Sequence, residues 1–376
     1  MSKKTIIIAG SSIIGILVLL ILFVWLLTTV KKKYVTYEKL EEKMVEAANK
    51  YYKTYPEMLP ADEGKYTLQY GSLVEGGFIK PLNELLKDGD ECTAEVNVYK
   101  NNASYDYIPK IDCGANYRTT ELSERIIIDN PIVETGSGLY RDENGGYYFR
   151  GKVENNYFAL GITGSGKKKK DILWRIISID ENGNVKLLSL TGFKERTVYD
   201  DRYNVETLKN SGYNDYEGSK LKDFLIRMNN EEALLTNAEK QKLVPMPICV
   251  GKRALTDITN DGSIECAEKS SPLYFGTITP YEFIRASLDE NCSKVSDRSC
   301  GNFNYLYNVE LSEWTVTSIP DNSYQAYALN GDVFEPAKAN LNKKVYPTAY
   351  INSRTLYRYG SGTLEDPYRF EEKNAE

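Results

Sequence analysis

The chain has 376 residues, with 53 acidic and 47 basic side chains and no histidine. Without histidine it cannot build a Ser-His-Asp or Cys-His catalytic device or a histidine-ligated metal site. Its net charge of −6 argues against nucleic acid as a partner, because surfaces that bind nucleic acids are basic. The length suits more than one compact domain.

Residues 6–30 form an apolar run without a charge, between Lys3–Lys4 and Lys31–Lys33. At about 1.5 Å per residue, a helix of this length reaches roughly 37 Å and can cross a ~30 Å hydrocarbon core. A cleaved signal peptide is the alternative, but its apolar part is shorter and ends at small residues. We therefore predict a transmembrane anchor over residues 1–33, with a single membrane span.

The six cysteines all follow this run and indicate an oxidising compartment. They fall into three close sequential pairs, which predicts the disulfides Cys92–Cys113, Cys249–Cys266 and Cys292–Cys300. Reduced core thiols are the alternative, and a metal site is disfavoured because no Cys-x-x-Cys spacing occurs. The lysines on the two sides of the run do not decide its orientation. The cysteines decide this orientation, because they predict that the remaining residues lie outside the cell, as an ectodomain on the cell membrane.

Apolar residues at three- and four-residue steps predict an amphipathic helix from Tyr37 to Tyr55 that continues the membrane helix and ends before Pro60. A short helix is expected at Pro81–Lys87. Two strands, Thr93–Tyr99 and Tyr105–Cys113, then form a hairpin whose open ends the first cysteine pair would join.

A long helix packed on a small antiparallel sheet resembles the type IV pilin and pseudopilin architecture, over roughly residues 5–120. The resemblance implies a pilin-like α+β domain over residues 34–125. The chain departs from the family pattern, since Gly10 is followed by Ser11 instead of an aromatic residue and no acid interrupts the apolar run. Processing by the pilin machinery is therefore not expected.

A domain boundary is expected near Asn130–Pro131, with a linker at Gly136–Gly138. Asn-Gly turns between apolar runs predict β-hairpins in the part that follows. The expected strands are Leu139–Tyr140, Tyr147–Arg150, Leu173–Asp180, Val185–Leu190, Glu313–Ser318, Tyr324–Leu329 and Val345–Ile351. The expected helices are Ser219–Met228, Thr236–Lys242 and Pro280–Leu288.

Five phrases in this order resemble an uncharacterised bacterial surface domain of the C-type-lectin-like superfold, over about residues 137–370. They are Tyr148–Gly151, Leu173–Ile177, Ser219–Leu225, Glu313–Thr317 and Gly360–Tyr368. The resemblance implies a disulfide-bearing, C-type-lectin-like mixed α+β domain over residues 126–376 that binds a partner outside the cell. The predicted fold class of the whole chain is thus α+β.

The segment from Asp257 to Glu268 has the oxygen-ligand spacing of a calcium-binding EF-hand loop. Its candidate calcium ligands are Asp257, Thr259, Asp261 and Glu268. Prolines before the segment break any entering helix, and Cys249 and Cys266 would close it into a loop. We predict an ordinary turn there, no metal and no cofactor, and keep calcium as the alternative.

The long stretch from Val250 to Asn308 lacks a clear periodic pattern, and two of the predicted disulfides lie within or border it, which indicates an ordered functional loop. Aromatic side chains in such a loop can stack on sugars or pack at interfaces. The candidate binding residues are Tyr274, Phe275, Tyr281, Phe303, Tyr305 and Tyr307.

From these features we predict a membrane-anchored bacterial cell-surface protein with a noncatalytic, adhesion-type domain that binds an extracellular glycan or protein. One alternative is a structural, pseudopilin-like subunit of an envelope or surface assembly. The other is an extracellular carboxylate-based hydrolase, which would need two carboxylates at a set separation.

Overall fold

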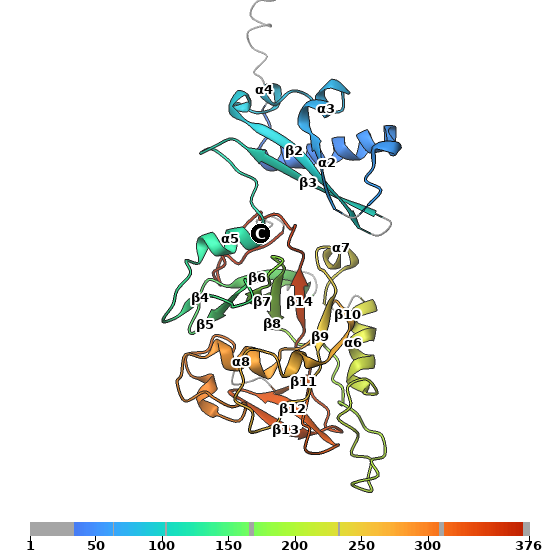
Figure 1. The fold of residues 1–376 in the computed structure, drawn as a ribbon, viewed down its shortest axis with the longest axis vertical. Coiled ribbons are helices and arrows are strands. Elements are labelled where there is room, and N and C mark those ends of the chain that lie inside the picture. The colour runs from blue at the N-terminus through green and yellow to red at the C-terminus, as the bar shows by residue number, and fades with distance from the viewer. Residues whose placement is uncertain are drawn as a thin grey trace, which may run out of the picture. The chain divides into compact units, whose positions relative to one another are not determined.

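The structure, a computed structural model, describes residues 34–62, 64–101, 104–164, 169–231, 234–307 and 312–370. The chain divides into two compact units, residues 1–119 and 120–376 (Figure 1). The domain boundary predicted from sequence, between residues 125 and 126, falls inside helix α5 (Leu122–Asp129). Leu122 and Ile126 of this helix are buried in the core of the second unit.

Helix α2 (Tyr37–Thr54) covers the sheet of the first unit with one apolar face. The buried residues Leu40, Met44 and Ala48 lie on one face because they follow three- and four-residue steps. They pack in one cluster with Val96 and Val98 of the sheet.

The first unit's sheet has the order β1-β2-β3, and short helical segments connect its first two strands. Strand bounds are β1 (Lys65–Gln69), β2 (Thr93–Asn101) and β3 (Ser104–Asp112). The connecting segments are α3 (Tyr70–Glu75), α4 (Leu82–Leu85) and η2 (Gly89–Glu91), whereas η1 (Pro56–Met58) precedes β1. Thr93 of β2 pairs with Asp112 of β3, which brings the adjacent Cys92 and Cys113 together in a disulfide.

The predicted fold class, an α+β chain whose membrane helix runs on into the first domain, is wrong. The described residues contain more strand than helix and form four sheets, and none of their helices is long and apolar enough to cross a bilayer. Helix α2 begins at Tyr37, because Thr36 has an extended backbone and its side chain accepts a hydrogen bond from the backbone of Lys39. The predicted span, residues 6–30, lies outside the described residues.

The largest sheet belongs to the second unit and has the strand order β14-β8-β7-β5-β4, with β6 paired to β7. Its strands are β4 (Gly138–Arg141), β5 (Tyr147–Arg150), β6 (Tyr157–Thr163), β7 (Lys170–Ile179), β8 (Val185–Ser189) and β14 (Thr348–Ile351). The hairpin predicted from the Asn182-Gly183 turn is confirmed, since β7 and β8 pair in antiparallel fashion. Gly183 has a φ of 85°, a conformation that glycine adopts without strain.

Two smaller sheets complete the second unit: the hairpin of β9 (Met246–Cys249) and β10 (Lys269–Leu273), and a three-stranded meander. The meander contains β11 (Ser312–Ser318), β12 (Gln325–Asn330) and β13 (Val333–Lys338). The helical segments are α6 (Lys220–Asn230), α7 (Asn237–Lys240), η4 (Glu265–Ala267), α8 (Pro280–Ala286) and η5 (Arg298–Gly301). Helix α8 lies against the meander (Figure 1), where the ring centres of Phe283 and Phe334 are 5.5 Å apart.

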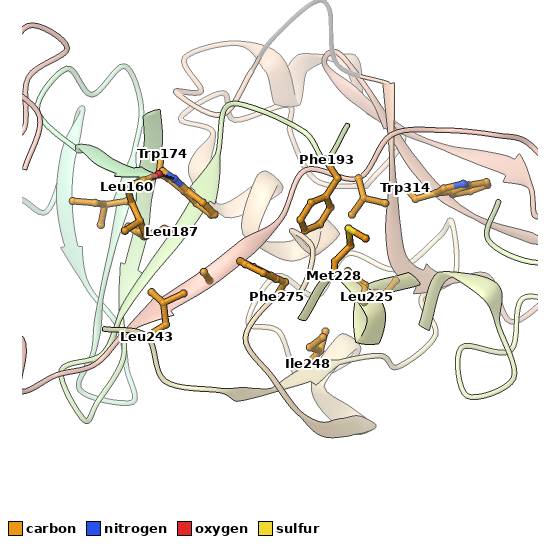
Figure 2. Packing of buried hydrophobic residues seen from close by; sticks show 14 of the residues in the cluster. Leu160, Trp174, Leu187, Phe193, Leu225, Met228, Leu243, Ile248, Phe275 and Trp314 are labelled. Atoms are coloured by element: carbon orange, nitrogen blue, oxygen red, sulfur yellow. Dashed lines mark hydrogen bonds between the residues drawn. The ribbon is translucent and has the colours of Figure 1, made fainter. Parts of the chain in front are cut away.

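Aromatic rings join the elements of the second unit in its core (Figure 2). Phe193 lies edge-on to Phe224 of α6 and to Phe275, with ring centres 5.7 Å and 5.5 Å apart. Trp174 of β7 is fully buried, and its indole nitrogen donates a hydrogen bond to the carbonyl of Leu160. Buried aromatics with satisfied polar atoms stabilise such a core at little desolvation cost.

Candidate functional site

A pocket lies in the second unit where the β9–β10 hairpin meets the edge of the large sheet and the start of α8. Gly276, three residues after β10, forms a bridge with Thr348 of β14, and both hydrogen bonds between their backbones measure 3.0 Å. We name this pocket the tyrosine pocket, after its lining residues Tyr274, Tyr281 and Tyr350. Its other lining residues are Lys186, Met246, Pro247, Ile248, Cys249, Leu273, Gly276, Thr277, Thr279 and Thr348.

The cavity of this pocket has a volume of about 40 Å³. Since a water molecule needs only about 10–15 Å³ of such space, the cavity accommodates a group of a few heavy atoms, not a whole sugar ring or peptide. The tyrosine pocket could therefore take one polar group that projects from a larger ligand.

Lys186 supplies the charge of the pocket and is paired inside the protein. It lies on β8, where every residue is buried because both faces of the strand are covered. Its ammonium group donates a hydrogen bond to Oε1 of Glu282 on α8, and the two side chains are 10% and 2% exposed. Oε2 of Glu282 accepts hydrogen bonds from the backbone nitrogen and hydroxyl of Thr279, at 2.9 Å and 2.8 Å.

The mutual attraction of Lys186 and Glu282 affects their pKa values more than their burial does. Burial would lower the pKa of Lys186, but the charge of Glu282 raises it above its ordinary value. Burial would likewise raise the pKa of Glu282, but Lys186 and the hydrogen bonds from Thr279 hold it below its ordinary value. Burial raises the pKa values of Tyr281 and Tyr350. Near neutral pH, the pair is therefore charged and these two tyrosines are neutral.

The tyrosine rings of the pocket are fixed by contacts with other segments. The Tyr281 ring packs on Gly262, where an added Cβ would approach ring atom Cζ to 2.8 Å. The Tyr350 ring centre is 5.5 Å from the Lys186 ammonium, a favourable cation–π distance. The backbone nitrogen of Tyr274 donates to the side chain of Asn229 at 2.6 Å. The pocket walls are thus held by elements far apart in sequence.

The six predicted aromatic residues do not form one surface. Tyr274 and Tyr281 line the tyrosine pocket, whereas Phe275 is fully buried in the core and cannot contact a ligand. Tyr305 is half-buried and packs against the core. Phe303 and Tyr307 are 54% and 44% exposed and do not line the pocket.

The predicted calcium candidates surround an arginine. Arg253 is fully buried in an ion pair with Glu265, with a nitrogen–oxygen distance of 3.0 Å. Its guanidinium also donates hydrogen bonds to the carbonyls of Asp257 and Thr259, at 3.1 Å and 2.8 Å. A positive guanidinium therefore already lies beside two of the four candidate residues, which disfavours a second cation there.

The carboxylates of this segment are also engaged locally. The Asp257 carboxylate accepts a hydrogen bond from the backbone of Ala254, and that of Asp261 accepts one from Ser263. Among the described residues, Asp257, Asp261 and Glu268 are not grouped closely enough to hold a metal ion together. The loop is closed by the Cys249–Cys266 disulfide, as predicted.

The disulfides join the three pairs predicted from sequence. Cys92 and Cys113 lie close to Asp88, in the one metal-like grouping found within the described ranges. Because both sulfur atoms belong to a disulfide, neither is a thiolate that could bind a metal.

Sequence reasoning missed Lys186, Glu282 and Tyr350. Glu282 carried a signal, since Thr279 followed three residues later by glutamate is the pattern of a capping box. Lys186 is a charged residue in an otherwise apolar strand. The sequence shows that this position is unusual, but not which residue pairs with the lysine. Comparison with known protein families, with curated proteins and with solved structures finds no match for this chain, so the two resemblances described above stay predictions.

Proposed function

We propose that the chain is a noncatalytic binding protein of an oxidising compartment at the cell surface. Its ligand is an extracellular glycan or protein that presents a small polar group to the tyrosine pocket. Tyrosine hydroxyls, threonine hydroxyls and one ammonium group can all hydrogen-bond to such a group. Close-fitting apolar walls from the β9–β10 hairpin would exclude water around it.

One observation carries the proposal: the ionisable groups in the pocket and beside it whose pKa values are shifted are all shifted away from neutrality. The pKa of Lys186 is raised, that of Glu282 is lowered, and those of Tyr281 and Tyr350 are raised. A general acid or base works best when its pKa lies near the working pH. Groups locked in one protonation state suit recognition better than proton transfer.

The three disulfides support a compartment outside the cytosol, where such bridges persist. The pocket lining contains no aspartate or glutamate, so it supplies no carboxylate pair to the alternative of a hydrolase. Glu282, the buried carboxylate beside the pocket, is engaged by Lys186 and Thr279.

A binding screen of the whole chain against a glycan array and cell-wall fragments tests the proposal. Tyr274→Ala removes a half-buried wall of the pocket, and Tyr66→Ala, at a tyrosine that is 40% exposed in the first unit, is the matched control. We expect a selected ligand to bind Tyr274→Ala about tenfold more weakly, which corresponds to about 1.4 kcal/mol, and to bind the control as it binds the unmodified chain.

Equal affinity of all three proteins for every ligand found would reject the tyrosine pocket as the binding site. Turnover of a bound glycan by the unmodified chain would instead support the hydrolase. Thermal unfolding of each variant separates loss of binding from loss of fold.

A further inference from the structure

We propose that residues 150–153 and 303–305 form a second binding surface, for the carboxylate or phosphate groups of an anionic polymer. We name it the cationic surface, after Arg150 and Lys152 of the first segment and Arg175, which hydrogen-bonds to Val153. It shares no residue with the tyrosine pocket and does not rest on the function proposed above.

Backbone contacts hold the two segments side by side. Gly151 forms a parallel bridge with Asn304, and its nitrogen donates to the carbonyl of Ala286 at 2.8 Å. The Asn304 side chain, which is buried, donates to the carbonyls of Phe283 and Cys300 at 2.9 Å and 2.8 Å. Both segments are thus fixed before any ligand arrives, which lowers the entropy cost of binding.

No carboxylate of the described residues pairs with the three cations of this surface. Arg150 donates to the carbonyl of Ser287 at 2.8 Å, and Arg175 donates to that of Val153 at 2.6 Å. The Nε atoms of both arginines are buried and have no hydrogen-bond partner in the described part of the chain. A buried charge without a counter-charge is costly, so an anion bound here would stabilise the site.

Arg175 is the most buried of the three cations, with 5% of its surface exposed. Its guanidinium lies between two tyrosine rings, 4.0 Å from the centre of Tyr157 and 5.0 Å from that of Tyr305. Burial lowers the pKa of Arg175, although these tyrosines act in the opposite direction. The guanidinium of Arg175 thus contributes positive potential from the interior, while Arg150 is half-buried and Lys152 is exposed.

Phe303 adds an exposed ring at the edge of the cationic surface. It is 54% exposed and has a φ of 46°, a left-handed conformation that is unfavourable for a residue with a Cβ. The ammonium of Lys152 is 5.3 Å from its ring centre. Strain that persists at an exposed aromatic residue is typical of binding sites, where the ring contributes to recognition.

The loop that carries Phe303 is held by its own contacts. The side chain of Asn302 donates to Asp289 at 2.8 Å, and the hydroxyl of Ser287 donates to the carbonyl of Asn302 at 2.9 Å. The Cys292–Cys300 disulfide closes the same loop. The Asp289 carboxylate accepts hydrogen bonds from Asn291 and Asn302. It makes no ion pair with the three cations in the described part of the chain.

The chemistry of these groups selects an anion. Guanidinium groups match the geometry of carboxylate and phosphate oxygens, and an adjacent ring packs on the carbon skeleton of a ligand. Because the whole chain carries a net charge of −6, polyanions are not drawn to it in general. Binding of a polyanion would have to come from a local cluster such as this one.

The test measures the binding of the whole chain to polyphosphate, to polygalacturonate and to neutral dextran at low salt. The variant Arg150→Gln/Lys152→Gln removes one half-buried and one exposed charge. Its control, Lys252→Gln/Lys338→Gln, removes two exposed charges outside the surface and gives the same net charge. We expect at least one polyanion to bind the first variant about tenfold more weakly and the control within about twofold of the unmodified chain.

Binding of polyphosphate alone would mean that the surface recognises phosphate groups, and binding of polygalacturonate alone that it recognises carboxylate groups. Binding of both would mean that it recognises either kind of anionic group. The proposal is overturned if neither polyanion binds, or if both double variants weaken binding equally. Lys152→Gln alone, at an exposed side chain, replaces the first variant if that variant does not fold. Phe303→Ala should weaken binding without any change in charge.

Discussion

Glu313 is a fully buried carboxyl group at the start of β11. One oxygen accepts a hydrogen bond from the backbone of Tyr346 at 3.1 Å, and the other has no partner among the described residues. Burial raises the pKa of Glu313 to about 8, although the hydrogen bond from Tyr346 acts in the opposite direction. Its ordinary value of 4.5 applies in the unfolded chain.

Between pH 4.5 and about 8, the folded chain therefore holds a proton on Glu313 that the unfolded chain has already lost. The free energy of unfolding should fall as the pH rises through this window, by up to about 5 kcal/mol at ~1.4 kcal/mol per pH unit. We expect Glu313→Gln to remove this slope. Urea unfolding at several pH values measures it, with Glu154→Gln at an exposed carboxylate as control. Parallel pH profiles for Glu313→Gln and the unmodified chain would contradict the assignment.

The buried pair of Lys186 and Glu282 stabilises the second unit only while both partners are present. Lys186→Met leaves the Glu282 carboxylate buried without its counter-charge, which typically costs about 3–5 kcal/mol. The double variant Lys186→Met/Glu282→Gln removes the charge and should recover more than half of that loss. Urea unfolding of the single and double variants gives the comparison. A double variant as unstable as Lys186→Met would show that shape, not charge, dominates the site.

The segment between Cys292 and Cys300 is short, and its disulfide orders the element η5 before the exposed Phe303. A bridge across this sequence separation of 8 stabilises the folded chain by about 2–3 kcal/mol, chiefly because it restricts the unfolded chain. Cys292→Ser/Cys300→Ser should lower stability by that amount. It should also speed amide hydrogen exchange over residues 289–305 while leaving β9 and β10 protected. Uniform exchange changes across the unit would mean that the bridge supports the whole core.

Each of the two units has its own hydrophobic core. One disulfide lies in the first unit, and two lie in the second. We expect calorimetry of the whole chain to show two unfolding transitions. Cys92→Ser/Cys113→Ser should lower only the transition of the first unit, by the effect of about 3 kcal/mol expected for a loop of this length. A single transition that shifts as a whole would mean that the units unfold together.

Local sequence signals determined many elements of this protein. Asn182-Gly183 fixed the β7–β8 hairpin, because few other residues adopt the backbone that a tight turn requires. Sequence neighbours among the cysteines gave all three bridges, since the two hairpins and the short loop bring such neighbours together. Apolar spacing located α2 and α6 to within a few residues.

Other features were decided only by the tertiary structure. Nothing local distinguishes Phe275, which is fully buried, from Phe303, which is 54% exposed, because burial depends on segments that pack from elsewhere in the chain. Likewise Lys186 and Glu282, which are 96 positions apart, become partners because β8 and α8 meet in the folded unit. Periodicity reports which residues share a face. The charge pair, the tyrosine pocket and the cationic surface depend on which faces meet.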